Sequence, residues 1–166
     1  MSITLTATIL INDFEVLKET VEELGYSMIE EPIEVALYKT VEYGYPVYLP
    51  SWKYPVVITE EGQIRYDNYN GMFGDQEYLD TLLQTYLEKK ITKDIKTQAE
   101  LSGYNIQMED NIIKLTKGNE TIEIQINKQH IIIDAKGFIG QKCKEEVNKI
   151  LNNLIIESQT LKQELY

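Results

Sequence analysis

The sequence predicts an α+β fold, a mostly antiparallel sheet with three helices packed on one face and ferredoxin-like helix–strand units. Hydrophobic residues make up 43% of the 166 residues and charged residues 26%, which is typical of a globular chain. Most patterned segments alternate apolar and polar residues as strands do, and three carry helical spacing. The longest apolar run has four residues and there is one cysteine, so we expect neither a membrane span nor an internal disulfide.

The chain begins with a predicted strand over residues 3–11, where threonines alternate with apolar residues. Asn12 or Asp13 then caps a helix, and Gly25 ends it, because glycine readily adopts the left-handed conformation that follows a helix. Two shorter strands are predicted next, at 26–29 and 33–38.

Residues 43–55 hold three of the four prolines and five aromatic residues. Because proline is confined to sheet edges and loops, this pattern predicts an edge strand and a loop. A hairpin is predicted at 56–66 and an Asn- and Gly-rich loop at 67–74. Asp75 then caps a second, long helix, which ends at Gly103.

The remaining residues predict a meander of four strands, at 104–108, 112–116, 121–126 and 131–135. A third helix is predicted after Gly140, and the polar tail after Ile156 is expected to fray. Two strands and one helix are marginal alone. We therefore expect a main domain at 1–118 and a small ββα extension at 119–166 that docks on the main sheet.

The negative charge is concentrated in the first half of the chain. The net charge is −11, and residues 1–80 carry 15 acidic side chains against four basic ones, which accounts for all of it. Such a field repels phosphate backbones and favours basic surfaces, so we expect no direct nucleic-acid binding. Three interpretations stay open: solubility, a purposeful acidic surface, and mimicry of nucleic acid.

Aromatic residues gather in the same half of the chain. Tyrosine and tryptophan join an apolar ring to a polar group, which suits interfaces; covering the sheet is the alternative. As partner-binding residues we predict Tyr43, Tyr45, Tyr48, Trp52, Tyr54 and Tyr69.

Residues that usually carry catalysis or bind metals are scarce. The chain has one histidine, His130, and one cysteine, Cys143, whereas a structural zinc needs about four ligands. Asp67–Gly71 resembles the start of a calcium loop, but Tyr69 and Tyr78 stand where ligands belong. Cys143 is predicted to be buried, with a reactive thiol as the alternative. We therefore predict no catalytic residue, no metal and no cofactor.

A Gly-x-x-Gly loop precedes the third predicted helix. Backbone N–H groups before a helix can bind a phosphate, and lysines surround this loop. The alternative is a tight turn from a strand into a helix. The candidate ligand-binding residues are Gly137, Gly140 and Lys142.

Two stretches carry a family resemblance. Thr6-Ala7-Thr8, Leu24-Gly25-Tyr26, Gly62–Gly71 and Gly103-Tyr104, in this order and spacing, resemble the hypothetical chloroplast reading frame thirty-five (Ycf) family over residues 1–118. Lys136–Cys143 fits the Lys-Gly-x-x-Gly-x-x-Cys stretch of a second small family, over residues 120–155. Both families are of unknown function. The resemblance therefore supplies no catalytic residues to carry over to this chain, and it implies an accessory role beside AAA-type ATPases.

These observations favour a non-enzymatic cytoplasmic adaptor or accessory protein that acts through protein–protein contacts. The first alternative is a small-ligand or nucleotide-binding regulator that uses the Gly137–Gly140 loop. The second is an acidic mimic of nucleic acid. A hydrolase would depend on Cys143 and His130 alone.

Overall fold

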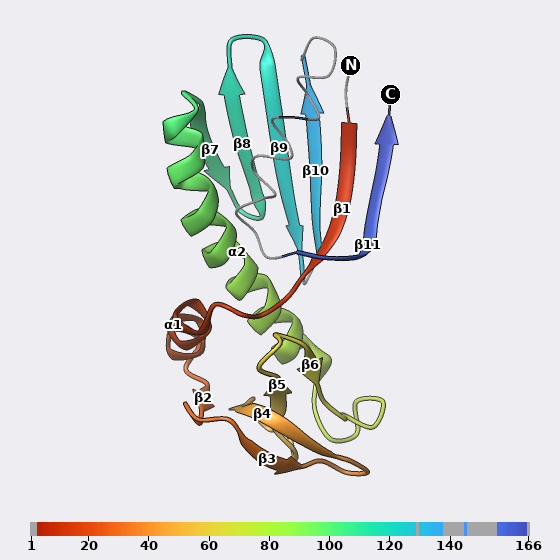
Figure 1. The fold of residues 1–166 in the computed structure, drawn as a ribbon. Coiled ribbons are helices and arrows are strands. Elements are labelled where there is room, and N and C mark those ends of the chain that lie inside the picture. Colours follow the sequence, from red (N-terminus) through yellow and green to blue (C-terminus); the bar gives the residue numbers. More distant parts are fainter. Residues whose placement is uncertain (1–2, 129, 138–144, 146–155, 166) are drawn as a thin grey trace. The chain divides into compact units, whose positions relative to one another are not determined.

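The computed structural model describes residues 3–128, 130–137, 145 and 156–165, and for 3–9, 97–98 and 156–165 it describes only the backbone (Figure 1). The fold is α+β with antiparallel sheets, as predicted. Within the described residues there are two helices, α1 (Phe14–Leu24) and α2 (Gln76–Leu101). Of the third predicted helix, after Gly140, the described residues include only Glu145, which is helical.

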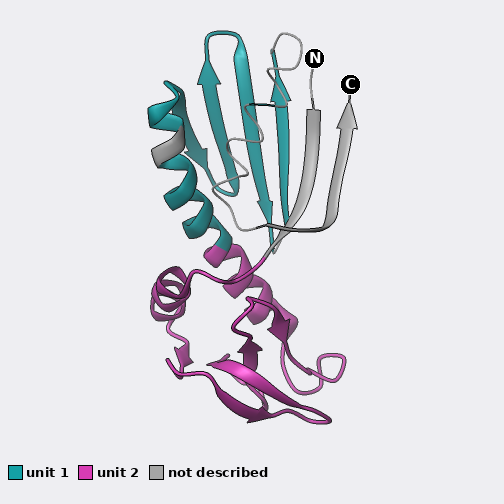
Figure 2. Cartoon of the chain, viewed as in Figure 1, with its two compact units in different colours: residues 1–9, 87–166 teal, residues 10–86 magenta. Residues whose placement is uncertain are grey.

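The strands form two sheets, where the sequence predicts one, and the chain divides into two compact units (Figure 2). Unit 1 comprises residues 1–9 and 87–166, and unit 2 comprises residues 10–86. The predicted domain boundary at 118/119 lies in the turn between two paired strands, where Lys117 pairs with Glu120. The division falls elsewhere because those strands belong to one continuous meander.

Unit 2 contains α1, the first part of α2 and a five-stranded sheet in the order β2-β4-β5-β6, with β3 also paired to β4. β4 is the longest of these strands, and it pairs with β3 through its first half and with β2 through its end. The bounds are β2 Ser27–Met28, β3 Ile33–Ala36, β4 Val41–Tyr48, β5 Val56–Ile58 and β6 Ile64–Arg65.

Helix α1 follows the sequence prediction closely. Asp13 is the N-cap, and its carboxylate accepts a hydrogen bond from the backbone N–H of Val16 at 3.2 Å. Gly25 ends the helix with φ +73°, the left-handed conformation expected of glycine there. The backbone N–H of Asp13 also donates to the hydroxyl of the fully buried Tyr86 at 3.0 Å, which ties the start of α1 to α2.

Unit 1 contains a six-stranded antiparallel sheet in the order β11-β1-β10-β9-β8-β7. The meander β7–β10 confirms the four predicted strands. The tail after Ile156, which we expect to fray, forms β11 and pairs with β1 instead. The bounds are β1 Ile3–Ile9, β7 Asn105–Glu109, β8 Ile112–Lys117, β9 Glu120–Asn127, β10 His130–Lys136 and β11 Ile156–Leu165.

Isoleucines dominate the core of unit 1. On β9, Ile122, Ile124 and Ile126 are buried while the residues between them are exposed, as expected for a strand with one buried face. Helix α2 adds a stripe in this unit at every fourth residue: Leu87, Ile91, Ile95 and Ala99 are all buried.

Candidate functional site

Four aromatic side chains in mutual contact lie on unit 2, and two of them are largely exposed. Tyr38 and Phe73 have ring centroids 5.1 Å apart, and Tyr69 stacks on Phe73 at 5.2 Å. Tyr38 is 45% exposed and Tyr69 44%, whereas Tyr54 and Phe73 are partly buried. We call Tyr38, Tyr54, Tyr69 and Phe73 the aromatic cluster.

Three separate segments supply the aromatic cluster: the β3–β4 turn, the β4–β5 loop and the β6–α2 loop. Tyr54 connects the cluster to the core, because it packs against Val35, Leu37 and Val57. The cluster therefore has a buried base and an exposed rim.

The backbone of the β6–α2 loop holds Tyr69 in a strained conformation. Tyr69, Asn70 and Gly71 have φ values of +47°, +53° and +89°, three successive residues in the left-handed region. This region costs a non-glycine residue about 1–2 kcal/mol. The carboxylate of Asp67 offsets part of that cost by accepting from the N–H of Tyr69 at 2.9 Å. The strain is retained although Tyr69 is exposed, which is more typical of a functional residue than of a core residue.

Trp52 supports this loop and is partly buried. Its indole N–H donates to the backbone oxygen of Asp75 at 2.9 Å. The indole ring also lies so close to Gly74 that a Cβ there would overlap it. The backbone N–H of Lys53 donates to the oxygen of Phe73 at 2.8 Å. Trp52 therefore positions the loop more than it presents a contact surface.

Lysine side chains lie beside the rings of the aromatic cluster. The Lys53 ammonium is 4.8 Å from the centre of the Phe73 ring, and that of Lys39 is 5.8 Å from Tyr38. A third base of unit 2, Lys18, is paired with Glu30 at 3.3 Å, and this contact raises the pKa of Lys18 above its ordinary value. The positions of Lys39 and Lys53 show that the rings of the aromatic cluster can interact with cations.

Unit 2, which bears the aromatic cluster, is acidic as a whole. Residues 10–86, which form unit 2, carry 15 acidic and four basic side chains, whereas the rest of the chain has 12 of each. The whole net charge of −11 thus belongs to the unit that bears the cluster.

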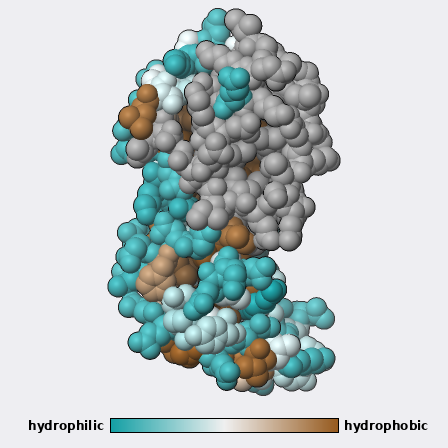
Figure 3. Space-filling view, in the orientation of Figure 1, coloured by the Kyte–Doolittle hydropathy of each residue, from teal (hydrophilic) through white to brown (hydrophobic). Residues whose placement is uncertain are grey.

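The β3–β4 hairpin has a second exposed surface with apolar atoms. Val41 is 65% exposed and Tyr43 52%, and they pair with the exposed Ala36 and Glu34. Figure 3 shows brown surface in the region of this hairpin, among hydrophilic atoms.

The six predicted partner-binding residues do not form one patch. Tyr54 and Tyr69 belong to the aromatic cluster, and Trp52 lies behind its loop. Tyr45 is partly buried against Phe14, with ring centroids 5.1 Å apart. The other two, Tyr43 and Tyr48, are exposed on β4.

The six predicted partner-binding residues do not include Tyr38 or Phe73, although Tyr38 belongs to the aromatic-rich stretch of the first half of the chain. Tyr38 follows an apolar run and so resembles the end of a buried strand. Phe73 lies in an Asn- and Gly-rich loop that gives no sign of its partners. The available signal was that Tyr38 and Phe73 lie in a turn and a loop, where packing of the core does not require an aromatic side chain.

Gly137 has a steric explanation. Its φ is +82°, and a Cβ would overlap the backbone oxygen of Asn119. This close approach of the backbone explains why position 137 is a glycine, and a tight turn at this point requires no bound ligand. The other members of the candidate ligand site, Gly140 and Lys142, lie outside the described residues, as does Cys143.

Metal and membrane features are not found in the described part of the chain. His130 is exposed at the start of β10. Among the described residues, no group of three or more His, Cys, Asp or Glu side chains is arranged to hold a metal ion. Neither α1 nor α2, the helices of that part, combines the length and apolar character needed to cross a membrane.

Comparison with known proteins leaves the family open, because no family model, curated protein or solved structure matches the chain.

Proposed function

We propose that this chain is a non-enzymatic cytoplasmic adaptor that binds a partner protein through the aromatic cluster, and that the partner presents a basic surface. The observation that carries the proposal is the exposure of Tyr38 and Tyr69, at 45% and 44%, within a cluster of contacting rings. Tyrosine is enriched at the residues that dominate binding energy in interfaces, because its ring contributes area at small entropic cost.

The construction of the cluster supports this use. Tyr54 packs on the core, and Tyr38 and Tyr69 both contact the partly buried Phe73. The two exposed rings are therefore held in place before a partner binds. Such preorganisation lowers the entropic cost of binding. The left-handed backbone at Tyr69 also supports a binding role, because strained backbone conformations cluster at functional sites.

The charge of unit 2 supports a basic partner. A net charge of −11 on residues 10–86 accelerates encounter with a positive surface and repels an acidic one. The family resemblance suggests an AAA-type ATPase as the first candidate to test.

Replacing both exposed rings, with Tyr38→Ala and Tyr69→Ala, is expected to weaken partner binding at least about tenfold, since interface aromatic residues often contribute more than about 1 kcal/mol each. The full chain carrying a tag is recovered from its own cells, and copurifying proteins are quantified by mass spectrometry. Each protein lost from the double variant is then purified and titrated against both chains.

The matched control is Leu101→Ala with Met108→Ala, which removes side chains that are 76% and 53% exposed from unit 1. The proposal requires a partner that survives the control, is lost in the double variant, and binds less tightly as salt increases. Equal recovery with both variants, or binding that salt does not affect, contradicts it.

A further inference from the structure

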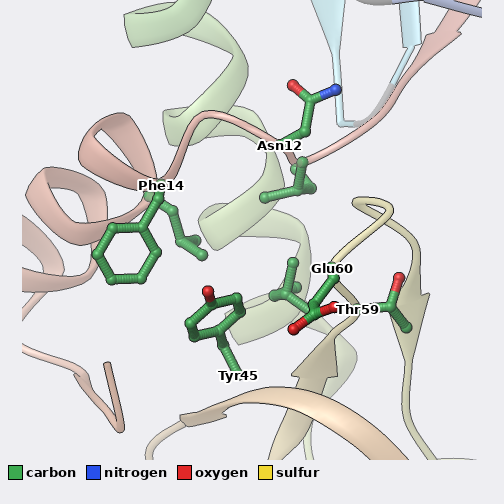
Figure 4. A pocket seen from close by; sticks show the side chains of 8 residues that line it. Asn12, Phe14, Tyr45, Thr59 and Glu60 are labelled. Carbon is green, nitrogen blue, oxygen red and sulfur yellow. The ribbon is translucent and has the colours of Figure 1, made fainter. Parts of the chain in front are cut away.

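A cavity of about 250 Å³ lies in unit 2 beside the start of α1 (Figure 4). It is smaller than the ~300–1,000 Å³ typical of sites for drug-sized ligands, so its size suits a single side chain. Its wall includes Phe14, Leu17, Tyr45, Ile58, Thr59 and Glu60.

The wall of this cavity combines two aromatic rings, the carboxylate of Glu60 and two neutral polar side chains, Asn12 and Thr59. Phe14 and Tyr45 contact each other at 5.1 Å with an angle of 46° between the ring planes. In Figure 4, the ring of Phe14 and the carboxylate of Glu60 lie on opposite sides of Tyr45. A group placed against Tyr45 would therefore meet a ring on one side and a negative charge on the other.

The polar groups of the wall favour a cation over an anion. Glu60 is the charged residue of the wall, and among the described residues no lysine, arginine or histidine lines it. The hydroxyl of Thr59 already accepts from the N–H of Gln63 at 3.0 Å. The nearby helix N-terminus does not attract an anion here, because the carboxylate of Asp13 caps it.

We infer that this cavity binds the guanidinium group of an arginine from the partner; the inference rests on the proposed function and names one contact within it. A planar guanidinium stacks on aromatic rings and donates paired hydrogen bonds to a carboxylate. A lysine ammonium is a compact and more strongly hydrated charge, so it uses a flat aromatic wall less well. The net charge of −11 on unit 2 adds a long-range attraction for the same group.

The test uses the full chain and three blocked tripeptides of the form Gly-X-Gly, in which X is arginine, lysine or citrulline. Citrulline has nearly the shape of arginine without its charge. Binding is measured from NMR chemical shifts of Phe14, Tyr45 and Ile58. We expect saturable shifts with the arginine peptide, weaker ones with lysine and none with citrulline.

Glu60 is exposed, so Glu60→Gln is expected to weaken binding of the arginine peptide about two- to fivefold, the range for an exposed charge pair. The matched control is Glu61→Gln, which removes the same charge from an equally exposed neighbour that does not line the cavity. This control variant should bind like the unaltered chain.

Equal effects of the two glutamine variants, equal binding of citrulline or lysine, or no saturable shift would each overturn the inference. These results are separable from the proposed function, because the Tyr38 and Tyr69 variant leaves every residue of this cavity wall unchanged. An arginine site without a copurifying partner would contradict the proposed function alone.

Discussion

Gly44→Ala is expected to destabilise unit 2 by about 3 kcal/mol, the upper end for overpacking a well-packed site. Gly44 is a buried residue of β4, and a Cβ there would overlap the backbone oxygen of Ile58 on β5. Backbone atoms cannot rotate aside as a side chain does. Adding one methyl group should therefore separate β4 from β5 locally, next to Tyr45.

The single tryptophan, Trp52, lies in unit 2, so its fluorescence during urea unfolding reports the stability of this unit. The control is Gly71→Ala, because Gly71 has φ +89° and a Cβ added there would meet no atom within 4 Å. That variant should cost only about 1–2 kcal/mol, from the left-handed backbone conformation. A Gly44→Ala midpoint equal to or above that of the control would show that β4 and β5 do not approach this closely.

Trp52→Ala is expected to release the β6–α2 loop and to destabilise unit 2 by about 2 kcal/mol, less than the ~3–5 kcal/mol of a fully buried tryptophan. The variant loses both the packing on Gly74 and the hydrogen bond to the backbone oxygen of Asp75. Partner binding should fall with it, although Trp52 itself need not touch the partner. Circular dichroism gives the stability, because the fluorescent residue is absent.

Hydrogen exchange separates this supporting role from a contact role. The N–H of Phe73 donates to Asn68 at 2.8 Å and that of Lys53 donates to Phe73 at 2.8 Å, so both should exchange faster in Trp52→Ala. Trp52→Phe keeps a ring over Gly74 and should lose only about 1 kcal/mol, for the hydrogen bond. Lost binding with unchanged exchange at these two amides would instead make Trp52 a contact residue.

Local signals in the sequence predicted the local structure well. The cap at Asp13, the end of α1 at Gly25 and the alternation on β9 each depend on neighbouring residues. Pairing over long distances was not predictable in this way. β1 pairs with β10, although more than a hundred residues separate Thr8 from His130, and no local pattern specifies that pairing. Two sheets were therefore predicted as one, and the ferredoxin-like units stay a prediction.

The candidate site could be predicted only in part for the same reason. The excess of aromatic residues and acidic charge is visible in the composition, and it points to the half of the chain that holds the aromatic cluster. Phe73, which contacts Tyr38, follows three residues in the left-handed conformation, Tyr69, Asn70 and Gly71. Propensities do not favour that conformation at a tyrosine, so the loop could not be derived from them.

The central claim is that a partner docks on the aromatic cluster, and site-specific photo-crosslinking in living cells tests it most directly. Benzoyl-phenylalanine is placed at Met72, next to Phe73, or at Leu101 in unit 1; both side chains are 76% exposed. We predict a crosslink to one basic-surfaced protein from position 72 that disappears with Tyr38→Ala and Tyr69→Ala, and none to that protein from position 101. Equal crosslinking from both positions, or a crosslink from position 72 that survives the loss of both tyrosines, would contradict the account.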